Sequence, residues 1–205
     1  MPAHENLLRH EHHDRLLDGM AKAVAAKGYA DTTIADIVRE AAVSRRSFYE
    51  HFVTKADCLV AFYRTASEQS LAVLAKAVDP SQPWETQVGR AVTAYLDFLS
   101  RDPAMLKTLF VEILGLGLPG LAVRREVNLQ IAGFIRVATQ GENTAPLSME
   151  LAMTVVGGIN ELILQAIEQD RSADLQPLVA PATLLIRAVA EQGRAGGTQG
   201  ITQQS

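Results

Sequence analysis

Residues 28–59, which read GYADTTIADIVREAAVSRRSFYEHFVTKADCL, decide the fold of this chain. Thr33 can accept orphan backbone N–H groups at the start of a helix, and Asp36 suits the first turn of that helix. An apolar face follows at helical spacing and is made of Ile34, Ile37, Val38 and Ala41. After a brief break, Ser44 can cap a second helix, which carries Phe48 and Phe52 on its inner side. The stretch therefore predicts two short helices that flank a tight turn.

Polar and basic side chains gather at the start of the second helix, namely Ser44, Arg45, Arg46, Ser47 and Tyr49. In a helix-turn-helix, the second helix enters the major groove of DNA with this end. Arginine can donate two hydrogen bonds to guanine O6 and N7, and hydroxyl groups can bond phosphates or base edges. Two adjacent arginines alone more often mark a solvated surface, but their place in this capped pattern predicts DNA contact.

Helical periodicity dominates the rest of the chain, and no alternation typical of half-buried strands is present. We expect a first helix over residues 9–27 that ends at Gly28. A fourth helix is expected over residues 55–78, after which Pro80 and Pro83 interrupt the helical pattern. Further helices are expected over residues 84–100, 103–114, 121–140, 148–168 and 178–192. The fold class is therefore all-α, a compact bundle of roughly nine helices.

Composition restricts the setting in which the chain works. A net charge of -4 argues against a non-specific nucleic-acid coat, so that any DNA contact must be local. The single cysteine, Cys58, cannot form an internal disulfide, and no signal peptide opens the chain, which together predict a cytoplasmic protein. The most apolar stretch, residues 147–167, is interrupted by Glu150, Asn160 and Glu161, so we expect a buried helix and no membrane partner.

The stretches Gly28 to Ile37, Ala41 to Phe52 and Lys55 to Leu59 together resemble the tetracycline-repressor (TetR) family, over roughly Arg9 to Arg64. The resemblance implies a three-helix DNA-binding unit and a long fourth helix that joins it to a ligand-binding and dimerising body. The domain prediction is residues 1–54 for the helix-turn-helix, 55–192 for the body and 193–205 for a disordered tail.

Position by position, the resemblance implies that Thr33, at the start of the second helix, contacts a DNA phosphate. It implies the same role for Tyr49 and His51. Lys55 matches the family's lysine at the start of the fourth helix. The predicted DNA-binding set is Thr33, Ser44, Arg45, Arg46, Ser47, Tyr49, His51 and Lys55. One departure is Ala42, where the family usually has glycine; positive φ there would cost about 1–2 kcal/mol.

The helices over residues 148–168 and 178–192 are apolar enough to need a partner subunit, and the resemblance implies that they form a four-helix dimer interface. We therefore expect a two-fold homodimer on a pseudo-palindromic double-stranded DNA operator. A small, hydrophobic effector is expected to release the DNA. Apolar walls with sparse polar groups, Asn128 among them, suit such a ligand. The predicted ligand-binding set is Trp84, Tyr95, Phe98, Phe110, Glu112, Ile113, Phe134 and Asn160.

Other patterns have simpler interpretations. The glycine spacing of residues 115–120 matches a dinucleotide fingerprint but follows a helix and contains Pro119, so a loop is expected. The histidines of residues 4–13 favour a solvated leader over a metal site, although such an arm can also touch DNA. No cofactor, metal or catalytic constellation is expected. The rival function is an all-α small-molecule carrier or enzyme with a vestigial DNA-binding motif, which tight ligand binding without a saturable DNA complex would favour.

Overall fold

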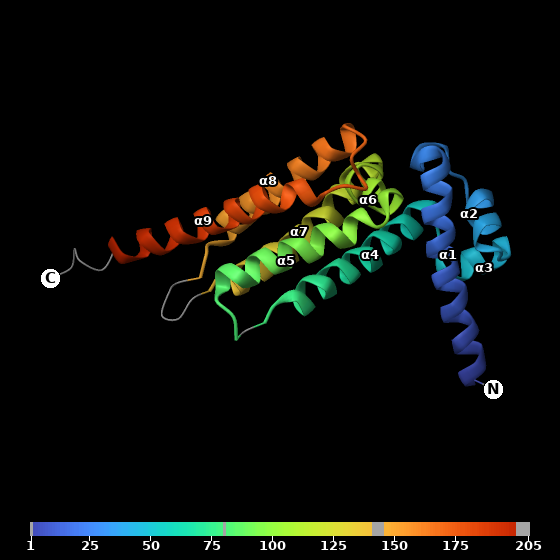
Figure 1. Cartoon of the computed structure of the whole chain (residues 1–205). Coiled ribbons are helices and arrows are strands. Elements are labelled where there is room, and N and C mark those ends of the chain that lie inside the picture. Colours follow the sequence, from blue (N-terminus) through green and yellow to red (C-terminus); the bar gives the residue numbers. More distant parts are fainter. Residues whose placement is uncertain (1, 80, 141–145, 200–205) are drawn as a thin grey trace. The chain divides into compact units, whose positions relative to one another are not determined.

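The computed structural model describes residues 2–79, 81–140 and 146–199, and the side chains of residues 8–79, 81–140 and 146–192 (Figure 1). All regular structure in these residues is helical, which confirms the all-α fold class. The elements in chain order are α1 (Pro2–Asp31), α2 (Ile34–Ala41), α3 (Arg45–His51), α4 (Lys55–Ala77), α5 (Trp84–Ser100), α6 (Pro103–Phe110), the 3-10 helix η1 (Glu112–Leu116), α7 (Leu118–Ala138), α8 (Met149–Glu168), the 3-10 helix η2 (Gln176–Leu178) and α9 (Val179–Gln199).

The described chain forms two compact units. The first unit takes residues up to 67 together with 104–124, and the second takes 68–103 together with the residues from 125 onward. Helices α4 and α7 each contribute residues to both units. Residues 55–67 and 104–124 group with the helix-turn-helix in this division, and the functional boundary expected after residue 54 stays a prediction.

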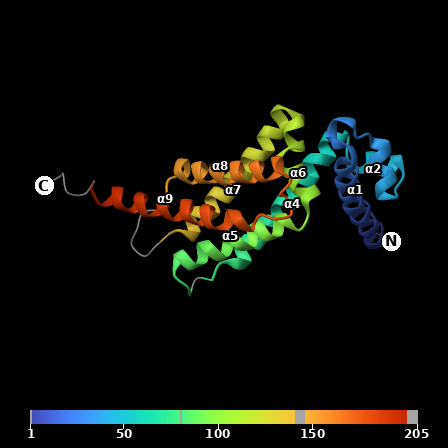
Figure 2. The same cartoon turned by 45° about the horizontal axis from the view of Figure 1, so that its top comes forward.

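In the first unit, α2 and α3 pack against one side of α1 (Figures 1 and 2). The close approach of α1 to α2 requires Gly19, because a Cβ there would lie 2.6 Å from the carbonyl oxygen of Ile37. The core is made of fully buried apolar side chains, among them Leu16, Met20, Ile37, Phe48 and Leu59. Burial of such side chains is the main stabilising contribution, at about 1.5–3 kcal/mol each.

The first helix breaks at Gly28, where it was expected to end. Gly28 has φ 79° and ψ 163°, a conformation essentially restricted to glycine, and one further turn follows to Asp31. The glycine therefore separates the long first helix from a short last turn within α1, and this last turn becomes important for the site described below.

In the second unit, α9 packs against both α5 and α8, and Figures 1 and 2 show the three helices running side by side. Its core contains Leu96, Leu99, Val155, Ile163 and Leu175. By length and composition alone α8 could cross a membrane, a test that core helices of folded proteins also pass, and 33% of its most apolar window is buried within the chain.

The segment after α5 differs from the sequence-based expectation. Helix α6 ends at Phe110 instead of residue 114, and residues 112–116 form η1 where part of a loop was expected. Helix α7 starts at Leu118 instead of residue 121, because Pro119 lies in the first turn, where its missing N–H is not needed. At the other end, α9 continues through residues 193–199 of the expected disordered tail, and residues 200–205 lie outside the described residues.

Candidate nucleic-acid interface and internal cavity

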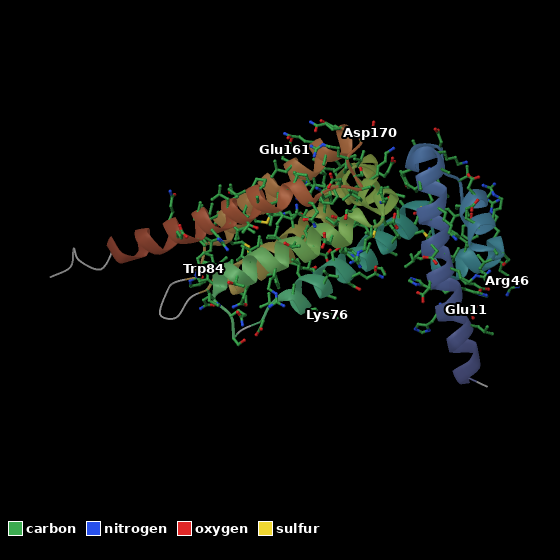
Figure 3. All side chains as sticks on the ribbon, viewed as in Figure 1. Glu11, Arg46, Lys76, Trp84, Glu161 and Asp170 are labelled. Atoms are coloured by element: carbon green, nitrogen blue, oxygen red, sulfur yellow. The ribbon has the colours of Figure 1, made fainter. Side chains whose placement is uncertain are left out.

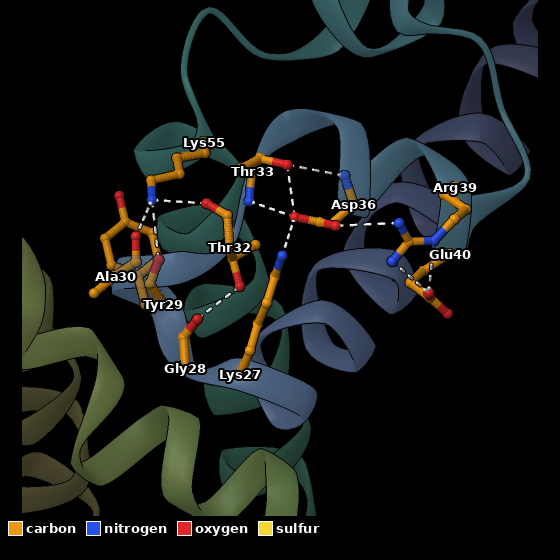
Figure 4. Close-up of polar contacts among 10 residues, drawn as sticks. All are labelled: Lys27, Gly28, Tyr29, Ala30, Thr32, Thr33, Asp36, Arg39, Glu40 and Lys55. Atoms are coloured by element: carbon orange, nitrogen blue, oxygen red, sulfur yellow. Dashed lines mark hydrogen bonds and ion pairs between the residues drawn. The ribbon is translucent and has the colours of Figure 1, made fainter.

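A reciprocal capping box fixes the start of α2 (Figure 4). The Thr33 hydroxyl accepts from the Asp36 amide at 3.2 Å, and the Thr33 amide donates to Asp36 Oδ2 at 2.9 Å. The same carboxylate meets the Lys27 ammonium at 2.5 Å and the Arg39 guanidinium at 3.2 Å. Hydrogen bonds from Lys27 and Thr33 hold the pKa of Asp36 well below its usual range. The carboxylate therefore ties α1 to the start of α2.

Thr33 uses its hydroxyl proton inside this box, because Oγ1 donates to Asp36 Oδ2 at 2.6 Å. A hydroxyl has only one proton to donate. The expected contact of Thr33 with a DNA phosphate would therefore break a bond that the folded chain already makes, and the structure gives Thr33 the role of a helix cap.

The turn between α2 and α3 is left-handed at Ala42, with φ 51° and ψ 45°, as the departure from glycine implied. Two backbone bonds close the end of α2: Ala42 N to Arg39 O at 3.2 Å, and Val43 N to Val38 O at 3.1 Å. Arg15 of α1 also donates to the carbonyl oxygens of Ala41 at 2.9 Å and Ala42 at 2.5 Å. Backbone bonds and a side chain from α1 thus fix the strained turn.

Helix α3 is capped by Ser44, whose Oγ accepts from the Ser47 amide at 3.0 Å. Phe48 is fully buried and anchors the helix. Arg45 and Arg46 are exposed at its start, and Figure 3 shows the Arg46 side chain projecting outward. Arg46 is 90% exposed and pairs with Glu50 at 3.2 Å, whereas Arg45 makes no hydrogen bond or ion pair to the described residues. Two guanidinium groups thus stand on a rigid, capped helix.

The two aromatic positions of α3 differ in their exposure. Tyr49 is 52% exposed, and its ring rests edge-on against Phe48 at 5.6 Å between centroids. His51 turns toward α1, with its ring 5.7 Å from that of His13, and its Nε2 is buried without a hydrogen-bond partner in the described chain. Burial lowers the pKa of His51, and His13 and Arg9 act in the same direction. Tyr49 is available to a phosphate, while this His51 nitrogen is not.

Lys55 holds the last turn of α1 (Figure 4). Its ammonium donates to the carbonyl oxygens of Tyr29 at 3.0 Å, Ala30 at 3.1 Å and Thr32 at 2.8 Å, and lies 4.5 Å from the centre of the Tyr29 ring. These three acceptors match the three N–H donors of a lysine. The structure therefore gives Lys55 a structural role, and its contact with DNA stays a prediction.

The second unit contains a small, partly open cavity of about 50 Å³. Its walls come from α4, α5, α7, α8 and α9, represented by Leu74, Tyr95, Phe134, Asn160 and Ile186. Three members of the predicted ligand-binding set, Tyr95, Phe134 and Asn160, thus line it. Sequence reasoning did not assign Ile131 or Val156 to the ligand site, although their helical spacing to Phe134 and Asn160 was a usable signal.

The other five residues of the predicted ligand-binding set do not line this cavity: Trp84, Phe98, Phe110, Glu112 and Ile113. Phe110 and Ile113 are buried in the first unit. The Glu112 carboxylate accepts from the Tyr29 amide at 2.8 Å and lies 3.9 Å from the Lys107 ammonium. Glu112 therefore caps the same turn of α1 that Lys55 holds from its other end.

Comparison with known proteins places these features in context. A sequence profile of the bacterial regulatory proteins of the tetR family matches residues 16–62. The fatty acid metabolism regulator protein of Bacillus subtilis (strain 168) is 20% identical over 173 residues, covering 80% of this chain and 88% of that relative. The profile match spans the helices from α1 to α4 that build the candidate interface.

Solved structures share the fold over most of the chain. The fatty acid degradation regulator FadR from Bacillus halodurans is similar with a TM-score of 0.72 and 17% identity, over 85% of this chain and 93% of that one. FadR from Bacillus subtilis in complex with stearoyl-CoA is similar with a TM-score of 0.67 and 18% identity, over 89% of this chain and 97% of that one.

Proposed function

We propose, from the premise that this chain belongs to the tetR family of bacterial regulatory proteins, that it is a cytoplasmic transcriptional repressor and not an enzyme. It binds a pseudo-palindromic operator as a homodimer and is released by a small apolar effector. The observation that carries the proposal is the pair of exposed arginines, Arg45 and Arg46, on a helix whose turn and caps are fully bonded. Rigid presentation of such side chains is what base reading requires.

Each part of α3 has its task in this proposal. Arg45 donates a bidentate pair to guanine in the major groove, and Arg46 exchanges its exposed bond to Glu50 for a base or phosphate. Tyr49 donates its hydroxyl to a phosphate, with Ser44 and Ser47 beside it at the start of the helix. Specificity comes from the arginines, and the hydroxyl groups set the register.

The apolar surface of α8 and α9 supports dimerisation. Leu184 of α9 is 68% exposed and Leu151 of α8 is 42% exposed, and a Cβ at Gly157 would meet nothing within 4 Å. A second copy of the chain would cover these side chains and place two α3 helices about 34–36 Å apart on the operator. Leu184→Glu is expected to give a monomer by light scattering and to weaken operator binding.

The cavity supports an apolar effector. At about 50 Å³ it is smaller than the roughly 300–1,000 Å³ of ordinary ligand pockets, so an effector must displace side chains when it enters. A ligand that binds only the repacked state shifts the population toward that state. The B. subtilis FadR structure holds stearoyl-CoA, which makes long-chain acyl-CoA the first compound to test here.

The route from effector to DNA follows helices that serve both units. Helix α4 begins with Lys55 at the last turn of α1 and carries Leu74 in the cavity wall. Helix α7 carries Ile131 and Phe134 in that wall, and its start directly follows η1, from which Glu112 caps the same turn. Coupling of this kind typically changes affinity by about 5–150-fold.

Selection of DNA from a randomised library, followed by footprinting with and without stearoyl-CoA, tests the proposal. We expect an inverted-repeat consensus and a protected site that the effector reduces. Tight ligand binding without any saturable, salt-dependent DNA complex would overturn the proposal in favour of a carrier or enzyme.

A further inference from the structure

We propose that the effector buries an uncharged portion in the cavity and that Asn160 selects it through one hydrogen bond to a neutral polar atom. This inference rests on the proposed function, because it gives a chemical class to the effector of the same regulator. Two features of the cavity carry it: the charge of its walls and the bonding of the Asn160 amide.

The walls carry no compensating charge. Among the described residues that line the cavity there is no Asp, Glu, Lys, Arg or His. A carboxylate or phosphate moved into such surroundings loses its hydration and finds no cation, at a cost of several kcal/mol. Any charged group of the effector must therefore stay outside, and the portion inside must be neutral.

Asn160 is a polar side chain of this wall with hydrogen-bonding capacity to spare. Its side chain is 5% exposed, and its Nδ2 donates to Asn128 Oδ1 at 3.3 Å. A side-chain amide has two N–H donors and an oxygen with two acceptor sites, so a second N–H and Oδ1 have no partner among the described residues. Such groups gain the most when a ligand satisfies them.

Thr139 provides an internal comparison, because it lines the same cavity and is also buried. Its hydroxyl donates to the carbonyl oxygen of Ile135 at 2.7 Å within α7. Its only proton is therefore committed, and it cannot donate to an effector without breaking that bond. Asn160, which can donate and accept at once, suits a hydroxyl, an ester or a thioester carbonyl equally well.

The test compares three probes of equal chain length by calorimetry on the full chain at neutral pH: dodecanol, methyl dodecanoate and dodecanoate. We expect the two neutral probes to bind, and the carboxylate, which is ionised at this pH, to bind at least about tenfold more weakly. Release of a labelled operator by each probe is measured in parallel. Equal or tighter binding of dodecanoate would overturn the inference, as would failure of all three probes to bind.

Two variants separate the role of Asn160 from general packing. Asn160→Leu removes the amide and is expected to weaken dodecanol binding about tenfold relative to dodecanoate, because the hydrogen bond is lost whereas the larger side chain acts on all three probes alike. Thr139→Val is expected to change the affinities for all three probes by one common factor, so that their ratios are preserved. Circular dichroism and melting curves establish that both variants fold. A folded Asn160→Leu variant with the wild-type preference among probes would overturn the role of Asn160.

The proposed function fails separately. If the chain forms no saturable operator complex while the probes bind in the expected order, the repressor assignment is wrong and the chemistry of the cavity stands. If the operator is bound and only a charged probe releases it, the repressor assignment stands and the inference about the effector is wrong.

Discussion

Replacement of Arg45 by alanine is the sharpest test of DNA reading by α3. A bidentate arginine–guanine contact discriminates by about 1–3 kcal/mol. Because the proposed homodimer presents Arg45 twice, the loss per operator is about 2–6 kcal/mol, or roughly thirty-fold to twenty-thousand-fold in Kd. No term from the unbound protein offsets this loss, because Arg45 makes no hydrogen bond or ion pair to the described residues that the mutation would break.

Arg46→Ala should cost less than Arg45→Ala. Its guanidinium must leave Glu50 to reach DNA, and the loss of that exposed pair offsets only about 0.3–0.5 kcal/mol of the binding free energy. Where both arginines make equal contacts with DNA, this offset makes Arg46→Ala the milder change by that amount. A uniform loss on all DNA sequences would identify a phosphate contact.

Fluorescence anisotropy with the selected operator and a scrambled duplex, over a series of salt concentrations, measures these effects. Arg45→Lys keeps the charge but not the planar fork, so it should retain binding to the scrambled duplex and lose preference for the operator. Arg101→Ala, an exposed arginine of the second unit, is the matched control. If Arg45→Ala and Arg101→Ala bind the operator with the same Kd, α3 does not read DNA through Arg45.

Three further changes test the scaffold by urea unfolding. Ala42→Gly should raise the free energy of unfolding by about 1 kcal/mol, because glycine adopts the left-handed turn without strain; a loss would contradict this. Asp36→Asn should lower the free energy of unfolding at neutral pH. This loss relative to the wild-type chain should shrink below a pH of about 4, because a carboxyl with a depressed pKa in the folded state stabilises the fold only while it is ionised. A loss independent of pH would argue against the ionised carboxylate. Lys55→Met should lower the free energy of unfolding by about 1–3 kcal/mol and leave the salt dependence of operator binding unchanged. Full stability, with a slope of log affinity against log salt concentration lowered by about one, would instead show that Lys55 contacts a DNA phosphate.

The helix-turn-helix could be predicted because its signals are local. The Thr33 and Asp36 box, the Ser44 cap and the inward Phe48 depend on residues within one or two turns of each other, and the structure has each of them. The cavity could be predicted only in part, because helical spacing does not say which face of a helix meets which neighbour. Tyr95 and Phe98 lie on the same helix, yet only Tyr95 lines the cavity.

Lys55 and Glu112 show why charged residues near a functional motif are hard to assign from sequence. Lys55 donates to Tyr29 O across 26 positions of chain, and Glu112 accepts from Tyr29 N across 83. The turn of α1 after the Gly28 kink has free N–H groups at one end, which bind a carboxylate, and free carbonyls at the other, which bind an ammonium. The same charges would let a lysine bind a DNA phosphate and a glutamate bind a polar ligand. Chemistry alone could not separate these uses. Only the fold, which brings both side chains to one backbone turn, makes Lys55 and Glu112 partners of the protein itself.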